Sequence, residues 1–478
     1  MNCRTIILAS WLFVLSLSLG AVASWAQDEP QPPEPPPVPY GPPKPAGYSF
    51  PGIGIGQEGE LQPDFSPLTG MQNTTLGLPE LRHSYWVPGI QLSSNISNRY
   101  AQTATGSNWG ADNYFLGNLS LVQGWDRAQL AINYTGGGYV STVSQQGSGF
   151  YQQLAVAQNY QSERWLIQFI DVFAYIPQSA FGFGGGTNLG IPGVPGSLGN
   201  TIPGLGGNYI QNQTIYGVGA YYSNTAALQA TYALSHRGSV TLAGSYGLLR
   251  FQGTGNYDSN TTVGSVGYNY ELSPNDTVGL VYRFSSYQYP GTPQAYSSNV
   301  ISAAYGRKIT GHLALRLFIG PEITNFRIPV GTSSRKTGLS AYAHMTYAFD
   351  RGVFLLAYIH GLSAGSGVLV GSNLDQFTAT FSRRLNRQWI GSVNFGYARN
   401  SPVEGNATAS NPTYSDWFVG GSVGRHIGRD FNLGIAYTAN IGSNYSASSC
   451  TGAGCNPSNN YSTITVNFQW HPRPFPLP

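Results

Sequence analysis

The sequence predicts an all-β protein, an antiparallel transmembrane β-barrel of about eighteen strands, with about sixteen to twenty as the allowed range. Three observations predict it. From about Ile90 to Trp470, apolar and polar residues alternate in segments of about ten to thirteen residues, the length that a tilted strand needs to cross a bilayer. Short connections between these segments alternate with long ones. Charged residues make up only 9% of the chain.

The composition suits a sheet with one face in lipid and the other in water. The 478 residues are 41% hydrophobic and include 62 Gly and 32 Tyr, and the mean hydropathy is −0.16. About a quarter of the residues of a typical soluble protein are charged, so this chain has too few charges for an ordinary soluble surface. A net charge of +3 without a Lys/Arg cluster excludes a nucleic-acid partner.

The first 26 residues have the pattern of a cleaved secretory signal. Arg4 precedes an apolar run that begins at Ile6, and two small residues, Ser24 and Ala26, end the segment. No later stretch reaches the roughly 18 to 20 apolar residues of a spanning helix. We therefore expect the mature chain to leave the cytoplasm and to cross a membrane as strands.

Residues 27–89 are rich in Pro and Gly, and we expect a largely irregular periplasmic segment ahead of a barrel at 90–470. Its run Pro-Glu-Pro-Pro-Pro-Val-Pro cannot make a packed core. Two interpretations are open: an arm that reaches a partner or the cell wall, and a bare spacer. A Pro-rich tail, residues 471–478, follows the barrel, and its prolines argue against further strand pairing.

Counting the connections gives the number of strands. Eight are short and carry charge, such as Ser273–Asp276, and nine are longer and rich in Gly, Ser, Asn and Pro. Seventeen connections join eighteen strands and place both ends of the barrel on the short-turn side. Two places are ambiguous. One is the first strand, near 90–100, and the other is 213–235, which fits either one long strand or a short hairpin.

The last expected strand, Tyr461–Trp470, has one apolar and one polar face. Its apolar residues Ile464, Val466, Phe468 and Trp470 fall at every second position. Because hydrocarbon does not tolerate an unpaired strand edge, this strand must pair with the first one. A final strand that ends in Phe or Trp resembles the assembly signal of bacterial outer-membrane β-barrels, and the resemblance assigns that role to Phe468 and Trp470.

Short motifs between about 78 and 470 extend this resemblance. They include Gly-Tyr-Asn-Tyr-Glu-Leu-Ser at 267–273, Ala304-Tyr305-Gly306-Arg307 and Gly320-Pro321-Glu322. With these motifs and its strand pattern, the chain resembles porin-type outer-membrane barrels and a group of uncharacterised bacterial barrels. The resemblance implies outer-membrane lipids, periplasmic chaperones and the barrel-assembly machinery as partners. It is compatible with a homotrimer and implies no substrate.

Four charged residues are candidates for the inner face. Arg283 is out of phase with an apolar row on its own segment, and Arg316 and Glu322 alternate with a Leu/Ile row. A charge that faces lipid at mid-depth costs about 2 to 4 kcal/mol, which favours the inner face. Asp171 lies in Trp165–Ile176, which is apolar on both faces. These charges either tune which solutes pass or form ion pairs, with Glu322 for example, that brace the wall or a plug.

The longest connection, residues 177–212, is a candidate constriction. The preceding strand is apolar on both sides, which suggests that something packs against it inside the barrel. The connection carries apolar side chains at Phe181, Phe183, Leu189 and Ile191. Long loops without regular structure are often functional. Two expectations are open: the loop folds inward against that strand, or it stays outside the barrel.

Two cysteines, Cys450 and Cys455, lie in a loop expected to be extracellular. A disulfide is favoured there over a metal site, because no His or further Cys lies nearby. The sequence contains no signature of a zinc protease, a serine hydrolase or a haem attachment site. His360, near the end of a strand, is the one candidate catalyst. We therefore predict that the protein is not an enzyme and has no cofactor and no metal.

The predicted function is a porin-like channel in the bacterial outer membrane for passive or facilitated diffusion of small hydrophilic solutes. A barrel of about eighteen strands is wide enough for an aqueous lumen. The alternative is a closed outer-membrane barrel that acts as a surface binding, adhesion or structural protein through its long extracellular loops.

Overall fold

A computed structural model describes the barrel and two residues of the chain ahead of it. The chain divides into two compact units, Met1–Ala46 and Gly47–Pro478, and every described residue belongs to the second unit. No helix among them is long and apolar enough to cross a membrane. The described residues are 68–69, 84–98, 109–142, 148–177, 220–253, 256–308, 312–327, 333–349, 351–365, 369–386, 388–403, 413–428, 430–443 and 460–477.

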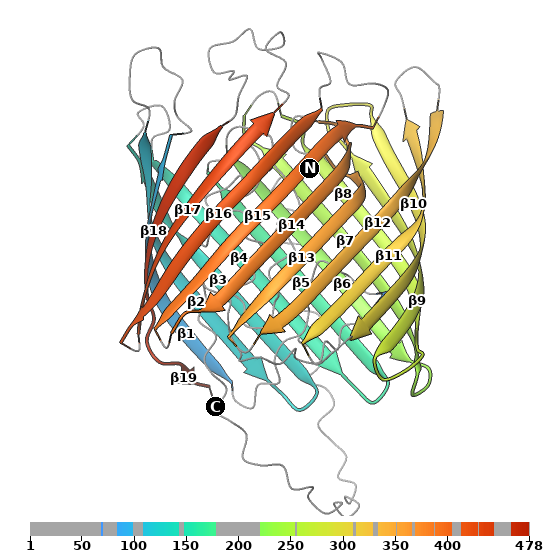
Figure 1. The fold of residues 1–478 in the computed structure, drawn as a ribbon, viewed down its shortest axis with the longest axis horizontal. Coiled ribbons are helices and arrows are strands. Elements are labelled where there is room, and N and C mark those ends of the chain that lie inside the picture. The colour runs from blue at the N-terminus through green and yellow to red at the C-terminus, as the bar shows by residue number, and fades with distance from the viewer. Residues whose placement is uncertain are drawn as a thin grey trace, which may run out of the picture. The chain divides into compact units, whose positions relative to one another are not determined.

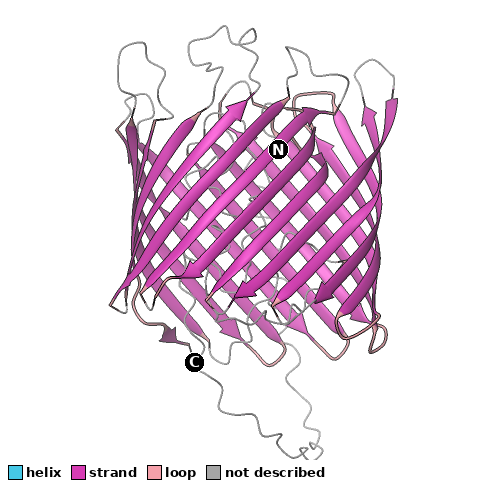
Figure 2. Ribbon diagram, viewed as in Figure 1, coloured by secondary structure: helices cyan, strands magenta, loops and turns pink. Residues whose placement is uncertain are grey.

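The described residues form strands joined by turns (Figures 1 and 2). The eighteen long strands have between 10 and 17 residues. They are β1 (Tyr85–Ser97), β2 (Gly110–Gly124), β3 (Ala128–Ser141), β4 (Ser148–Gln161), β5 (Trp165–Ile176), β6 (Tyr221–Ala233), β7 (Gly238–Phe251), β8 (Ser259–Glu271), β9 (Asp276–Gln288), β10 (Ala295–Lys308), β11 (Leu313–Arg327), β12 (Ser333–Phe349), β13 (Gly352–Ser363), β14 (Ser372–Arg384), β15 (Trp389–Pro402), β16 (Tyr414–Ile427), β17 (Phe431–Ser443) and β18 (Tyr461–Trp470).

Each long strand pairs antiparallel with the next one in the sequence, and the last pairs with the first. Figure 1 shows β1 and β18 side by side at this seam. Side chains reinforce it, because the Thr465 hydroxyl donates to Asn95 Oδ1 (2.9 Å) and the Thr463 hydroxyl donates to Ser97 Oγ (3.0 Å). The sheet therefore has no free edge along this seam, and the predicted closed antiparallel barrel of eighteen strands is confirmed.

Three details differ from the expectation or resolve it. β1 begins at Tyr85 rather than near 90, and the described part of 213–235 forms one strand, β6. The tail after β18 also pairs, since a two-residue strand, β19 (Phe475–Pro476), lies beside the start of β1. Pro476 lacks an N–H, but the next residue supplies the donor: Leu477 N donates to Ser84 O at 2.9 Å. The prolines of the tail therefore do not prevent a short bridge.

The outward rows of the barrel are apolar and exposed. Leu280, Ile319 and Val393 are 59%, 56% and 57% exposed, and each of the eighteen long strands exposes at least one large apolar side chain. Successive side chains on a strand point to opposite faces, so one row of each strand is turned outward together. An apolar belt around the described barrel is the surface that a membrane-spanning sheet needs.

The inner face has an apolar sector and a polar sector. On β2–β6 the inward side chains form two buried apolar clusters, which share the inner rows of these strands and extend to Leu249 on β7. The members are Val122, Ala131, Ala155, Ala157, Ile170, Val172 and Ala227 in one, and Tyr114, Leu116, Tyr139, Tyr151, Ala174, Ile176, Tyr221 and Leu249 in the other. From β7 to β14 the inner rows carry many hydroxyl groups. The site considered below lies in this polar sector.

Candidate channel interior

The polar sector borders a cavity of about 420 Å³ inside the barrel. Hydroxyl groups from neighbouring strands are the most frequent polar groups in its lining, and apolar side chains line it as well. No single motif in the sequence marks these hydroxyl residues as a set. Each hydroxyl group offers a solute both a hydrogen-bond donor and an acceptor. The hydroxyl residues are Thr69, Ser223, Thr225, Ser245, Ser259, Thr261, Ser265, Ser285, Ser302, Ser340 and Ser363.

Arg283 brings a positive charge to this cavity. It lies on β9, where its neighbours in the sheet are Ser265 of β8 and Val300 of β10. Its Nη2 donates to Ser340 Oγ of β12 at 3.2 Å, so the side chain reaches over β10 and β11 along the inner wall. Among the described residues the guanidinium is paired with no carboxylate. Its charge is therefore open to a solute.

Glu322 lies in the same wall but is held by other groups. It is on β11, opposite Val300, and is 5% exposed. Ser298 Oγ donates to its Oε1 at 2.5 Å, and the backbone N–H of Leu362 donates to its Oε2 at 3.3 Å. These bonds tie β10 and the end of β13 to β11. Glu322 thus has a bracing role, and its bracing partners are neutral groups rather than the arginine that the ion-pair interpretation required.

Arg316 is also on the inner row of β11, closer to the short-turn ends of the strands. Its sheet neighbours are Gly306 of β10 and His344 of β12. Next to it, the ring of Tyr342 stacks on that of His344, with 6.4 Å between ring centroids. Arg316 and Glu322 lie on the same face of β11, six residues apart, but Arg316 is not among the residues that line the 420 Å³ cavity. The two predicted inner arginines therefore lie at different depths.

Asp171 faces outward, and the expectation that it lines the lumen is wrong. The inward row of β5 is buried, and Asp171 is out of phase with it. The residues of this row are Gln168, Ile170, Val172, Ala174 and Ile176. Its carboxylate accepts a hydrogen bond from Asn224 Nδ2 at 2.8 Å. The sequence could not assign its face, because both rows of β5 are apolar and an alternating pattern is needed to tell them apart.

His360 lies on the outward row of β13, opposite Asp375 of β14. Its Nδ1 is 2.6 Å from Asp375 Oδ1, and the Tyr358 hydroxyl donates to the same oxygen at 3.3 Å. In the described part of the chain neither a serine nor a cysteine is among its side-chain partners. The arrangement is a contact between an imidazole and a carboxylate on the barrel wall.

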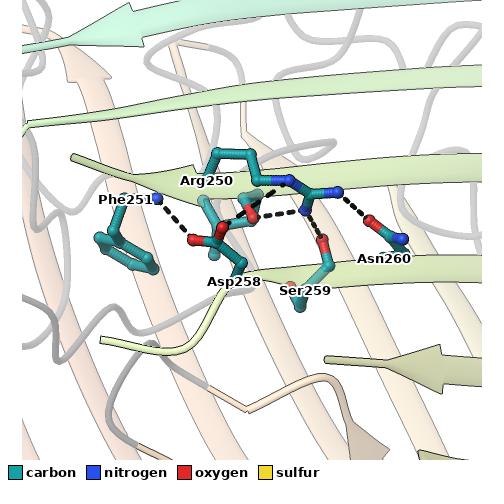
Figure 3. Close-up of polar contacts among 6 residues, drawn as sticks. Arg250, Phe251, Asp258, Ser259 and Asn260 are labelled. Atoms are coloured by element: carbon teal, nitrogen blue, oxygen red, sulfur yellow. Dashed lines mark hydrogen bonds and ion pairs between the residues drawn. The ribbon is translucent and has the colours of Figure 1, made fainter. Parts of the chain in front are cut away.

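At the opposite end of the barrel from the short turns, Arg250 fastens the β7–β8 pair (Figure 3). Its guanidinium donates to the backbone oxygens of Leu249 (2.9 Å) and Ser259 (2.8 Å) and to the Asn260 side chain. Asp258 is 3.8 Å away and accepts a hydrogen bond from the Phe251 N–H at 2.9 Å. This network holds the strand ends together, and Arg250 itself is not among the residues that line the cavity.

The remaining predicted residues fall outside the described part of the chain. They are Phe181, Phe183, Leu189 and Ile191 of the proposed constriction loop and the pair Cys450 and Cys455. The inward constriction and the disulfide stay predictions. Phe468 and Trp470 of the expected assembly signal are described, and both belong to the outward row of β18, opposite Leu92 and Ile90.

No protein-family model matches this sequence, and no curated protein matches it. Solved structures with a similar backbone fold include a protein described as an outer-membrane protein and one described as a porin. OpdK of Pseudomonas aeruginosa has 8% identity and a TM-score of 0.43, covering 82% of this chain and 99% of its own. A BenF-like porin from Pseudomonas fluorescens Pf-5 has 8% identity and a TM-score of 0.44, covering 84% and 100%. OccAB4 of Acinetobacter baumannii has 6% identity and a TM-score of 0.43, covering 83% and 99%. At these values the likeness says nothing about solutes.

Proposed function

We propose that the protein is an outer-membrane channel through which small hydrophilic solutes diffuse. The apolar belt on the outward rows supports a place in a membrane, and a membrane barrel of eighteen strands supports an outer-membrane location. The observation that carries the channel function is the cavity inside the barrel, lined by hydroxyl groups and by Arg283. Such a lining replaces part of the hydration shell of a polar solute without binding it tightly.

Conductance of the refolded protein in planar bilayers tests this function. We expect steady, stepwise currents in salt solution, because a water-filled lumen passes ions. A barrel that inserts but carries no steady current would contradict the channel and would favour the alternative of a closed barrel that works through its extracellular loops.

The charge of Arg283 makes the test specific. Arg283→Gln removes a positive charge from the cavity lining, so anions should lose preference relative to cations. The reversal potential in a KCl gradient measures this change. The matched control is Arg383→Gln, since Arg383 is exposed on the outward row of β14 near the short-turn end. Equal reversal potentials for the wild type and Arg283→Gln would remove Arg283 from the solute path.

A further inference from the structure

Two residues that precede the barrel in the sequence, Leu68 and Thr69, lie inside it. They are 6% and 2% exposed, and their contacts with the inner wall come from β8 to β11. The backbone N–H of Thr69 donates to Asn269 Oδ1 at 2.7 Å, and Asn269 is 200 residues further along the chain. Asn269 in turn donates through Nδ2 to Ser239 Oγ (3.3 Å) and Thr241 Oγ1 (3.2 Å). The acceptor for Thr69 is therefore held in place by β7.

Three glycines on neighbouring strands make the space for these two residues. A Cβ added to Gly267 of β8 would lie 2.4 Å from Thr69 Cβ, and one added to Gly279 of β9 would lie 2.6 Å from Thr69 Cγ2. A Cβ on Gly306 of β10 would lie 3.1 Å from Leu68 Cδ1. Real Cβ atoms almost never approach other atoms within 3.0 Å. Any residue larger than glycine at 267 or 279 would therefore overlap with Thr69 in its present position.

The side chain of Leu68 completes the fit. It forms a buried cluster with Ala304 of β10 and Phe318 of β11, and Val281 and Tyr342 pack against this cluster. Burial of the leucine side chain away from water favours this position. We call the three glycines together with Ala304 and Phe318 the glycine niche.

The glycine niche lies toward the short-turn ends of the strands and next to the cavity. Gly279 is close to the start of β9 at Asp276, and Gly306 is close to the end of β10 at Lys308. Thr69 also lines the 420 Å³ cavity that contains Arg283. Thr69, held in the niche, therefore borders the cavity near the short-turn ends of the strands.

We propose that Leu68 and Thr69 are an internal anchor, a packing contact on the inner wall that narrows the lumen on the short-turn side. This inference deepens the proposed channel function and rests on it for the effect on conductance. The anchor itself is a packing contact, so it can also be tested without any current. The occupant of the niche is a pair of residues of the same chain, Leu68 and Thr69.

Two substitutions remove the anchor from opposite sides of the contact. Leu68→Asp places a charge in an apolar cluster, and Gly267→Val fills the niche from the wall with a residue that favours strands. Both should raise the single-channel conductance of barrels that assemble, as judged by heat-modifiable migration on gels. The matched control is Gly338→Val, because Gly338 is on the inner row of β12 and a Cβ there meets nothing within 4 Å.

Each result separates the possibilities. A rise for Leu68→Asp and Gly267→Val, with wild-type conductance for Gly338→Val, supports the anchor. Unchanged conductance in both anchor variants, or a fall in Gly267→Val as expected of mere narrowing by the added valine, overturns it.

A cysteine pair tests the contact independently of current. In a chain with Cys450 and Cys455 replaced by Ser, Thr69→Cys with Gly279→Cys should form a disulfide, detected as a change in gel migration that a reducing agent reverses. Thr69→Cys with Gly338→Cys should not. Disulfide formation in a barrel that carries no current would refute the channel function and leave the anchor standing. No disulfide, with normal conductance, would refute the anchor alone.

Discussion

At the scale of single residues, the outward pair of Asp171 and Asn224 is the least expected feature of the wall. Asp171 lies near the middle of β5, between Val156 of β4 and Ala226 of β6, on the row that carries the apolar belt. An acidic side chain there is costly in lipid, though less so than Arg or Lys. The amide of Asn224 offsets part of this cost by donating to the carboxylate.

The pair predicts a coupled effect on stability. Asn224→Ala leaves the carboxylate without its donor and should lower the free energy of unfolding by about 1 to 3 kcal/mol. Asp171→Val combined with Asn224→Ala removes both polar groups and should restore much of that loss. Denaturant unfolding in lipid vesicles measures both, with Thr262→Ala on the outward row of β8 as the control. Equal losses for the single and the double variant would contradict the coupling.

At the scale of the element, the two faces of β18 have different roles. Its inward hydroxyls bond to β1 across the seam, whereas its outward row, with Phe468 and Trp470, is turned to the apolar belt. The neighbouring strand carries a similar row, since Phe431 lies opposite Trp470 and Leu433 opposite Phe468. Apolar content alone therefore does not distinguish β18 from β17, but its position at the end of the barrel does.

This comparison defines the test of the assembly signal. Phe468→Ser with Trp470→Ser should lower membrane insertion in cells far more than it alters the conductance of barrels that do assemble. Phe431→Ser with Leu433→Ser is the matched control, because it removes the same kind of surface at the same depth from β17. If the two double variants insert equally well, the row on β18 acts only as apolar surface and the assembly role is lost.

At the scale of the whole molecule, closure of the barrel depends on β18 and not on the tail that follows it. β18 pairs on one side with β17 and on the other with β1, and β19 adds only two residue pairs to β1. A chain that ends at Trp470 keeps every pair between long strands. We expect it to form a heat-modifiable barrel, with a modest loss of stability from the missing stack of Phe475 on Trp86 (4.9 Å).

A chain that ends at residue 459 lacks β18, so β1 and β17 each keep an unpaired edge in the membrane. Each unpaired backbone group in hydrocarbon costs several kcal/mol, and no heat-modifiable barrel should form. Gel migration after refolding into vesicles compares the two truncations. Assembly of the shorter chain would show that closure by β18 is dispensable.

The alternating pattern predicted most of the fold because strand geometry is local. A period of two assigns the faces of β11 and β18 directly, and the parity of turns and loops gave the count of eighteen. The same rule placed Arg283 on the face of β9 opposite to the apolar row, and Arg283 does line the cavity. On β5 both rows of side chains are apolar, so the alternation of apolar and polar residues could not tell the inner face from the outer one. Asp171 was assigned to the wrong face for that reason.

By itself, the sequence predicted a closed barrel of about eighteen strands and, on strands with an alternating pattern, the face that meets lipid, because these follow from spacing along the chain and from backbone hydrogen bonding. Only the tertiary structure decided which residues meet across the interior. Arg283 reaches Ser340, and Thr69 lies against Gly267 and Gly279, about 200 positions away. Such contacts depend on the curvature of the closed wall and on the volume left by each side chain, and no local period in the sequence encodes them.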